Sequence, residues 1–222
     1  MNYLITSLSL SLVLFFTPLK LMAIESGSGS EFIMSSNGAN VQLSIYLAKA
    51  TDKEIGVEFY FKTGSIYMPH MWQQFSMKRD SGAIRITEGY MKLGKMKPVE
   101  KMTQEDMNIN KQKGVELNDF LFSKKEEISK DFIAEETIEI PAGTIRAAHY
   151  RKVNNGQTVD FWISEQVKPI GLVKLVSKSK KQASHNYTIE LNSLLKNVGA
   201  EIDPSQAMPM SNRTRETMQL KR

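Results

Sequence analysis

Residues 136–176 read ETIEIPAGTIRAAHYRKVNNGQTVDFWISEQVKPIGLVKLV, and they divide into four short strand patterns separated by three turn signals. Ile138 and Ile140 alternate with polar residues, which is the pattern of a half-buried strand. Pro141 has no amide hydrogen to offer to a ladder, so we expect the first strand to end there. Asn155-Gly156 favours a type I′ hairpin turn, because that turn needs positive φ at both central residues. The segment is therefore predicted to form an antiparallel meander.

Strand patterns continue on both sides of this segment. In residues 41–48 and 54–62 every second residue is a strongly apolar aliphatic or phenylalanine side chain, and the two segments are predicted to form a hairpin with a continuous apolar face. A helix is expected over residues 120–128. The other expected strands are 31–36, 73–79, 83–93 and 187–198, and the expected loops are 63–72, 80–82 and 177–184. The predicted fold is mainly β, a strongly curved antiparallel sheet or open half-barrel with one or two short helices packed against it.

The N-terminus is typical of an export signal. Residues 1–23 contain an apolar run of h-region length, a proline that ends it, and Ala23 at the expected cleavage position. We expect a periplasmic protein with no stable membrane span after cleavage; the alternative is an uncleaved anchor in the inner membrane. The remaining chain is divided into a flexible lead-in (24–30), a single β-rich domain (31–202) and a flexible C-terminal tail (203–222).

Composition excludes several classes of function. The chain has 222 residues and no cysteine, so it has no disulfide, no thiolate metal site and no cysteine nucleophile. Its formal net charge of +5 is mild. The basic loop that includes Lys178, Lys180 and Lys181 carries no aromatic residue on which a base could stack, so no nucleic-acid partner is expected.

No catalytic or metal motif is present in the sequence. The three histidines, His70, His149 and His185, lie in separate segments without the spacing of metal ligands. There is no Gly-x-Ser-x-Gly elbow and no glycine-rich phosphate loop. We expect a protein that is not an enzyme and needs no cofactor or metal.

Aromatic side chains on the strands are the candidates for a ligand site. Five could line an apolar cavity, although packing residues of a plain core would give the same pattern. These five are Phe59, Phe61, Phe75, Phe161 and Trp162. Trp162 is expected on the opposite face from Phe161, so both faces of that strand need a cover. Seven methionines lie between Met68 and Met107, and their soft side chains suit an adaptable apolar surface.

The order of turns and strands resembles a group of exported bacterial proteins of unknown function whose sheet is similar to that of the LolA/LolB-like lipoprotein carriers. The resemblance rests on residues 140–144 (IPAGT), 149–150 (HY), 160–164 (DFWIS) and 169–174 (PIGLVK). It implies a curved sheet whose concave side holds acyl chains. Two functions follow as hypotheses: a non-enzymatic protein that binds a lipid or a lipid-modified partner, or an envelope scaffold that binds a protein partner through loops or the tail.

Overall fold

The computed structural model describes residues 26–51, 54–63, 70–80, 83–108, 129–154, 156–181 and 186–217. These residues form one 12-stranded sheet with two short α-helices and one 3-10 helix, so the prediction of a mainly β fold is confirmed. The described part of the chain contains no helix that is long and apolar enough to span a membrane. The predicted signal at 1–23 and the predicted helix at 120–128 lie outside the described residues.

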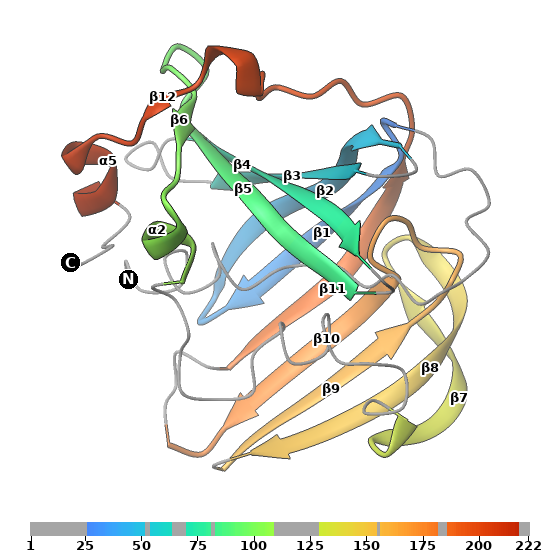
Figure 1. The fold of residues 1–222 in the computed structure, drawn as a ribbon. Coiled ribbons are helices and arrows are strands. Elements are labelled where there is room, and N and C mark those ends of the chain that lie inside the picture. The colour runs from blue at the N-terminus through green and yellow to red at the C-terminus, as the bar shows by residue number, and fades with distance from the viewer. Residues whose placement is uncertain are drawn as a thin grey trace.

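The sheet runs in the order β12-β6-β5-β4-β3-β2-β1-β11-β10-β9-β8-β7 (Figure 1). The strands are β1 (Gly29–Ser36), β2 (Ala39–Ala50), β3 (Glu54–Thr63), β4 (Met71–Asp80), β5 (Ala83–Leu93), β6 (Glu100–Lys101), β7 (Phe132–Ile140), β8 (Gly143–Asn154), β9 (Gln157–Ile163), β10 (Leu172–Ser179), β11 (Tyr187–Leu195) and β12 (Met208–Pro209). The helices are α2 (Gln104–Asn108), η2 (Pro204–Gln206) and α5 (Asn212–Thr217). Every pairing is antiparallel except that of β12 with β6. Two meanders, β1 to β6 and β7 to β11, are joined in the middle of the sheet by the pairing of β1 with β11.

Turn chemistry sets the register of the hairpins. Asn37 and Gly38 adopt positive φ (48° and 76°) between β1 and β2, as a type I′ turn requires. The turn at residues 141–142 places Ile140 opposite Gly143, and the next hairpin places Asn154 opposite Gln157. The predicted meander over residues 136–176 is therefore confirmed.

Three boundaries differ from the expectation. β4 begins at Met71, so Trp72 lies in a strand and is buried, whereas the sequence predicts a loop through residue 72. β10 continues to Ser179 into the predicted basic loop, because Ser177 packs into the buried layer of the sheet. β1 begins at Gly29, inside the predicted lead-in, and Ser30 is fully buried there.

Residues 203–217 pack against the sheet, although the sequence predicts a flexible tail from residue 203. They form η2, β12 and α5, and β12 extends the sheet beside β6. Met210 lies in the main hydrophobic core and Ile202 lies in a second apolar cluster. Single apolar residues in a polar sequence have no periodicity, and their burial here depends on a surface that distant strands provide.

One end of the sheet bends back on itself. The backbone N–H of Ala142, in the β7–β8 turn, donates a hydrogen bond to the carbonyl of Leu191 on β11 (3.2 Å). Three strands separate β7 from β11 in the order of the sheet, so this bond can form only where the sheet bends. In Figure 1, β4 and β5 also run at a large angle to β8 and β9.

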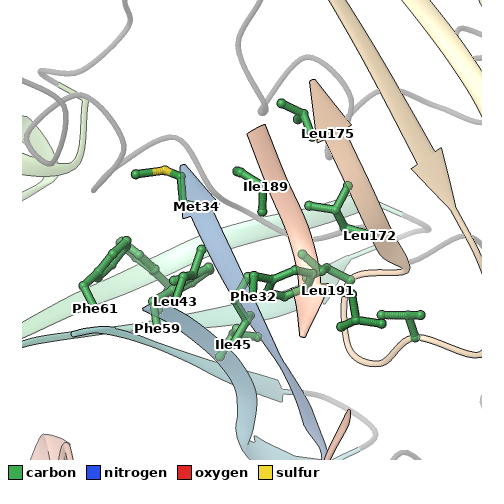
Figure 2. Packing of buried hydrophobic residues seen from close by; sticks show 14 of the residues in the cluster. Phe32, Met34, Leu43, Ile45, Phe59, Phe61, Leu172, Leu175, Ile189 and Leu191 are labelled. Carbon is green, nitrogen blue, oxygen red and sulfur yellow. The ribbon is translucent and has the colours of Figure 1, made fainter. Parts of the chain in front are cut away.

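Two rows of directly opposed apolar residues build the core on one face of the sheet, which we call the first face. One row crosses six strands through Leu191, Phe32, Leu43, Phe61, Met71 and Leu93. The other crosses from β8 to β2 through Tyr150, Phe161, Leu175, Ile189, Met34 and Val41. Figure 2 shows labelled members of both rows gathered on the same side of their strands. The opposite side, which carries Glu58 and Trp162, is called the second face.

Candidate functional site

Four of the five candidate cavity residues share the first face. Phe59, Phe61, Phe75 and Phe161 are all buried members of one hydrophobic cluster. The rings of Phe59 and Phe75 meet edge to face with centroids 5.9 Å apart. The ring of Phe161 stacks on Tyr150 at 5.1 Å. The sheet therefore brings aromatic side chains from β3, β4 and β9 to a single apolar surface.

Gln73 interrupts this surface with a polar group. It lies directly between Phe59 and Met91 in the strand register, in a row that continues to Ile45. The residue is only 1% exposed, and its Nε2 is buried without a hydrogen-bond partner in the structure. A buried donor without an acceptor destabilises the folded state by about 1–3 kcal/mol. Such an amide on an apolar face is a candidate for contact with an acceptor atom of a ligand.

Methionines gather on the same face beside Gln73. Met71, Met77, Met91, Met102 and Met210 all belong to the hydrophobic cluster, and Met107 packs against it. A Cβ at Gly89 would lie 2.8 Å from the Met107 sulfur and 3.1 Å from the Met102 sulfur, so both flexible side chains pack directly on the backbone of β5 at Gly89. Unbranched, polarisable side chains of this kind can repack around ligands of different shape.

Trp162 does not share the surface with the phenylalanines. Its neighbour Phe161 faces the first face, and alternation along β9 places Trp162 on the second face. There the indole stacks on the imidazole of His149 with centroids 4.3 Å apart, and Lys174 Nζ lies 5.9 Å from the indole centroid. The sequence correctly separates Trp162 from Phe161, and the structure places Trp162 on the opposite face from the four phenylalanines.

A polar cluster surrounds Trp162 on the second face. The two ring nitrogens of His149 lie 2.9 Å from Glu136 Oε1 and 2.8 Å from Asp160 Oδ1. Trp162 Nε1 donates to Glu136 Oε2 (2.9 Å), and this hydrogen bond is the main reason why the pKa of Glu136 is lowered. Arg151 Nε donates to Asp160 (2.7 Å). The cluster ties β7, β8 and β9 together, and the residues that the structure describes include no group of three acidic, histidine or cysteine side chains placed to hold a metal ion.

The spacing of these residues along the chain does not reveal this cluster, but the register set by the hairpins does. The turn at residues 141–142 sets Glu136 opposite Ala147, beside His149, and the pairing of β8 with β9 sets His149 opposite Trp162. Cross-strand register, rather than an i, i+2 pattern, identifies the partners of His149.

A buried carboxylate fastens the C-terminal segment to the second face. Glu58 is fully buried and accepts hydrogen bonds from the Tyr46 hydroxyl, Gln74 Nε2 (3.0 Å) and the backbone N–H groups of Glu201 (3.0 Å) and Ile202 (3.1 Å). Burial raises the pKa of Glu58, and burial together with the neighbouring carboxylate raises the pKa of Tyr46. These hydrogen bonds hold the segment that follows β11 against β3 and β4.

A second fastening joins the C-terminal helix to α2. Arg215 donates from Nε to Asp106 Oδ1 (2.9 Å) and from a terminal nitrogen to Oδ2 (3.0 Å), and Asp106 also accepts from the backbone N–H of Thr103 (2.9 Å). The Arg215 hydrogen bond is the largest cause that lowers the pKa of Asp106, from 3.8 to about 2. The bidentate geometry makes this pair stronger than a single-point ion pair.

We expect acid to release α5. A carboxyl group with a lowered pKa in the folded state contributes stability above its usual pKa of 3.8, and this contribution is lost as the pH falls through about 2. The protection factors of the amides at residues 212–217, which correct for the intrinsic pH dependence of exchange, should therefore fall between about pH 4 and pH 2. Asp106→Asn should show fast exchange there already at neutral pH, whereas Glu105→Gln, which changes the exposed neighbouring carboxylate, should not. Equal exchange in both variants would contradict a role for the Asp106–Arg215 pair.

The fold and site define a mainly β protein with an apolar sheet face. No protein-family model and no curated protein matches the chain. Distant structural similarity exists to the crystal structure of MucB (8% identity, TM-score 0.42, covering 86% of this chain and 60% of that chain). A structure of the Pseudomonas aeruginosa MucA/MucB complex is similar at the same level (6% identity, TM-score 0.45, covering 85% of this chain and 59% of that chain). The chain spans about three fifths of each of those chains, and TM-scores below 0.5 carry no functional argument.

Proposed function

We propose that this protein binds a hydrophobic ligand, either a lipid or an acyl chain, against the first face of its sheet and catalyses no reaction on it. The observation that carries the proposal is Gln73, whose buried Nε2 has no partner in a row of apolar residues. An acyl chain that ends in a carboxylate or an ester or amide carbonyl supplies both things this place needs: apolar surface for the phenylalanines and methionines, and one acceptor for the amide. A pure hydrocarbon supplies only the first.

The surroundings of Gln73 support a ligand of this class. Phe59 and Phe75 provide rigid aromatic walls, and the methionines of β4, β5 and α2 provide adaptable ones. Phe61 and Phe161 extend the apolar surface along the strand rows. We propose that the sheet as a whole acts as an open half-barrel around the ligand, and that residues 1–23 direct the protein to the periplasm, where lipids and lipid-modified proteins are its partners.

Native mass spectrometry tests the proposal directly. The protein is purified from the envelope of its own host, its intact mass is measured under conditions in which lipid complexes survive, and the sample is then extracted with organic solvent. Bound lipid at a stoichiometric level is expected, and the extract identifies its class. Protein that carries only its own mass would contradict the proposal and would favour the alternative, an envelope scaffold that binds a protein partner.

Gln73→Leu separates the role of the amide from that of the apolar surface. The empty variant should be more stable by about 1–3 kcal/mol, because the unpaired donor is gone and the shape is nearly kept. Binding of a long-chain fatty acid should weaken about tenfold, the equivalent of one hydrogen bond to a charged acceptor. Binding of an alkane probe of the same length, measured alongside, should be unchanged. Unchanged stability together with an equal loss for both probes would show that Gln73 is merely a packing residue.

A further inference from the structure

β7 is a long edge strand with a free side. It is the last strand of the sheet, it spans nine residues, and within the described part of the chain it pairs only with β8. The opposite end of the sheet is different, because β12 there contains only two residues. An edge strand of this length presents a row of N–H and C=O groups to which another extended chain can bind.

The register shows which backbone groups of β7 point away from β8. The N–H of Arg151 donates to the carbonyl of Asp131, so Arg151 directs its backbone groups from β8 toward β7. Backbone groups alternate along an antiparallel strand, so Ala147 and Ile145 also face β7, and their partners Glu136 and Ile138 face β8 in return. It follows that the N–H and C=O groups of Glu135, Thr137 and Glu139 point outward from the sheet.

The side chains of these residues define the charge of the edge. Glu135, Thr137 and Glu139 are exposed, and the carboxylate of Glu135 lies 3.5 Å from Arg146 Nε on the strand behind it. At the start of β7, Phe132 and Ile133 are 45% and 52% exposed. A second copy of β7 paired antiparallel about Thr137 would place Glu135 opposite Glu139 twice, and directly opposed like charges are unfavourable. The edge is therefore complementary to a basic chain and not to itself.

We propose that β7 binds an extended basic segment of a protein partner as an added strand of the sheet. Main-chain hydrogen bonds to Glu135, Thr137 and Glu139 hold the segment, and lysine or arginine side chains opposite Glu135 and Glu139 select it. The residues between them alternate to the other face, where Ile138 is partly buried, so apolar residues fit there. This interaction lies on a different part of the sheet from the proposed ligand and does not depend on it.

A labelled peptide of alternating lysine and valine tests the proposal against the purified full chain at physiological salt. The expected result is saturable binding, which a peptide with alternate amides methylated loses at least tenfold, since methylation removes the donors and keeps the charge. Thr137→Pro, which removes an outward N–H and leaves the bonds to β8 in place, should also weaken binding at least tenfold. Val153→Thr, an exposed substitution on β8 that leaves every residue of β7 unchanged, is the control and should bind normally.

Charge reversal gives a second test that does not require a proline. Glu135→Lys/Glu139→Lys should lose the lysine peptide and bind a peptide of alternating glutamate and valine instead. No binding to the native protein would overturn the proposal, because the glutamates would then serve only to prevent self-pairing of the edge. Binding that survives both amide methylation and Thr137→Pro would overturn it as well, since it would reflect surface charge without strand addition.

Discussion

Glu58→Ala is expected to lower the free energy of unfolding by about 3–5 kcal/mol. The substitution removes the acceptor of four hydrogen bonds at a fully buried position. The Tyr46 hydroxyl, the Gln74 amide and two backbone N–H groups would then be left without it. Because two of those donors belong to Glu201 and Ile202, the C-terminal segment should detach before the rest of the sheet unfolds. Denaturant unfolding gives the global loss, and amide exchange at residues 201 and 202 gives the local one.

Glu54→Ala is the matched control on the same strand. Glu54 pairs with Lys49 at 2.7 Å, but both side chains are substantially exposed, so its removal should change stability by less than about 1 kcal/mol. If Glu58→Ala were as mild as Glu54→Ala, the hydrogen bonds to Glu58 would not be what holds the C-terminal segment on the sheet.

The pH dependence of stability gives an independent signature of Glu58. Burial raises the pKa of this carboxyl group, although its hydrogen bonds act in the opposite direction. A group whose pKa is higher in the folded state stabilises the fold fully below its unfolded pKa, and this contribution declines as the pH rises through the folded value. Glu58→Gln cannot ionise, so its unfolding free energy should lack that decline. A parallel pH profile for the two proteins would argue against a raised pKa.

Phe59→Ala should also lower the free energy of unfolding by about 3–5 kcal/mol. Phe59 is almost fully buried, packs edge to face on Phe75, and lies beside Gln73 in the register, so its loss leaves a cavity at the centre of the proposed ligand site. The cavity also gives the proposed ligand more room. A saturating fatty acid should therefore recover part of the lost stability, because a ligand that binds only the folded state stabilises it.

Phe132→Ala provides the comparison for Phe59→Ala. Phe132 is 45% exposed at the start of β7 and contacts Tyr150 edge to face, so its removal should destabilise by about 1 kcal/mol or less and should not alter fatty-acid binding. If no acyl ligand raised the unfolding free energy of Phe59→Ala, either the ligand would bind away from Phe59 or the protein would bind no such ligand.

The prediction of the sheet succeeded where local chemistry determines structure. Alternation at residues 41–48 and 54–62 identifies two strands, and Gly156, whose φ is 81°, lies in the hairpin connection that the Asn-Gly pair predicts, because glycine accepts positive φ. Strand boundaries were less accurate at Met71 and Ser177, where burial against neighbouring strands extends the ladder beyond the alternating pattern.

Part of the arrangement around the candidate residues was recognisable from the sequence, and their binding of a ligand stays a prediction. The four phenylalanines were recognisable as strand residues of one apolar face, and the methionines as adaptable neighbours. Gln73 was not, because a glutamine in a strand is ordinary until the register places it between Phe59 and Met91. The partners of His149 likewise depend on two hairpins that bring Glu136 and Asp160 to either side of it.

The sequence by itself determined the mainly β class, the hairpins and the inward side of each strand, since these follow from side-chain alternation and turn conformation over a few residues. Tertiary structure alone decided the pairing of β1 with β11 and the burial of Glu58 beneath residues 201 and 202. It also decided the ion pair of Arg215 with Asp106 and the burial of the Gln73 amide without a hydrogen-bond partner. Each of these joins segments far apart in the chain or depends on what surrounds a single side chain. Their energies depend on desolvation and on hydrogen-bond partners that no local pattern records.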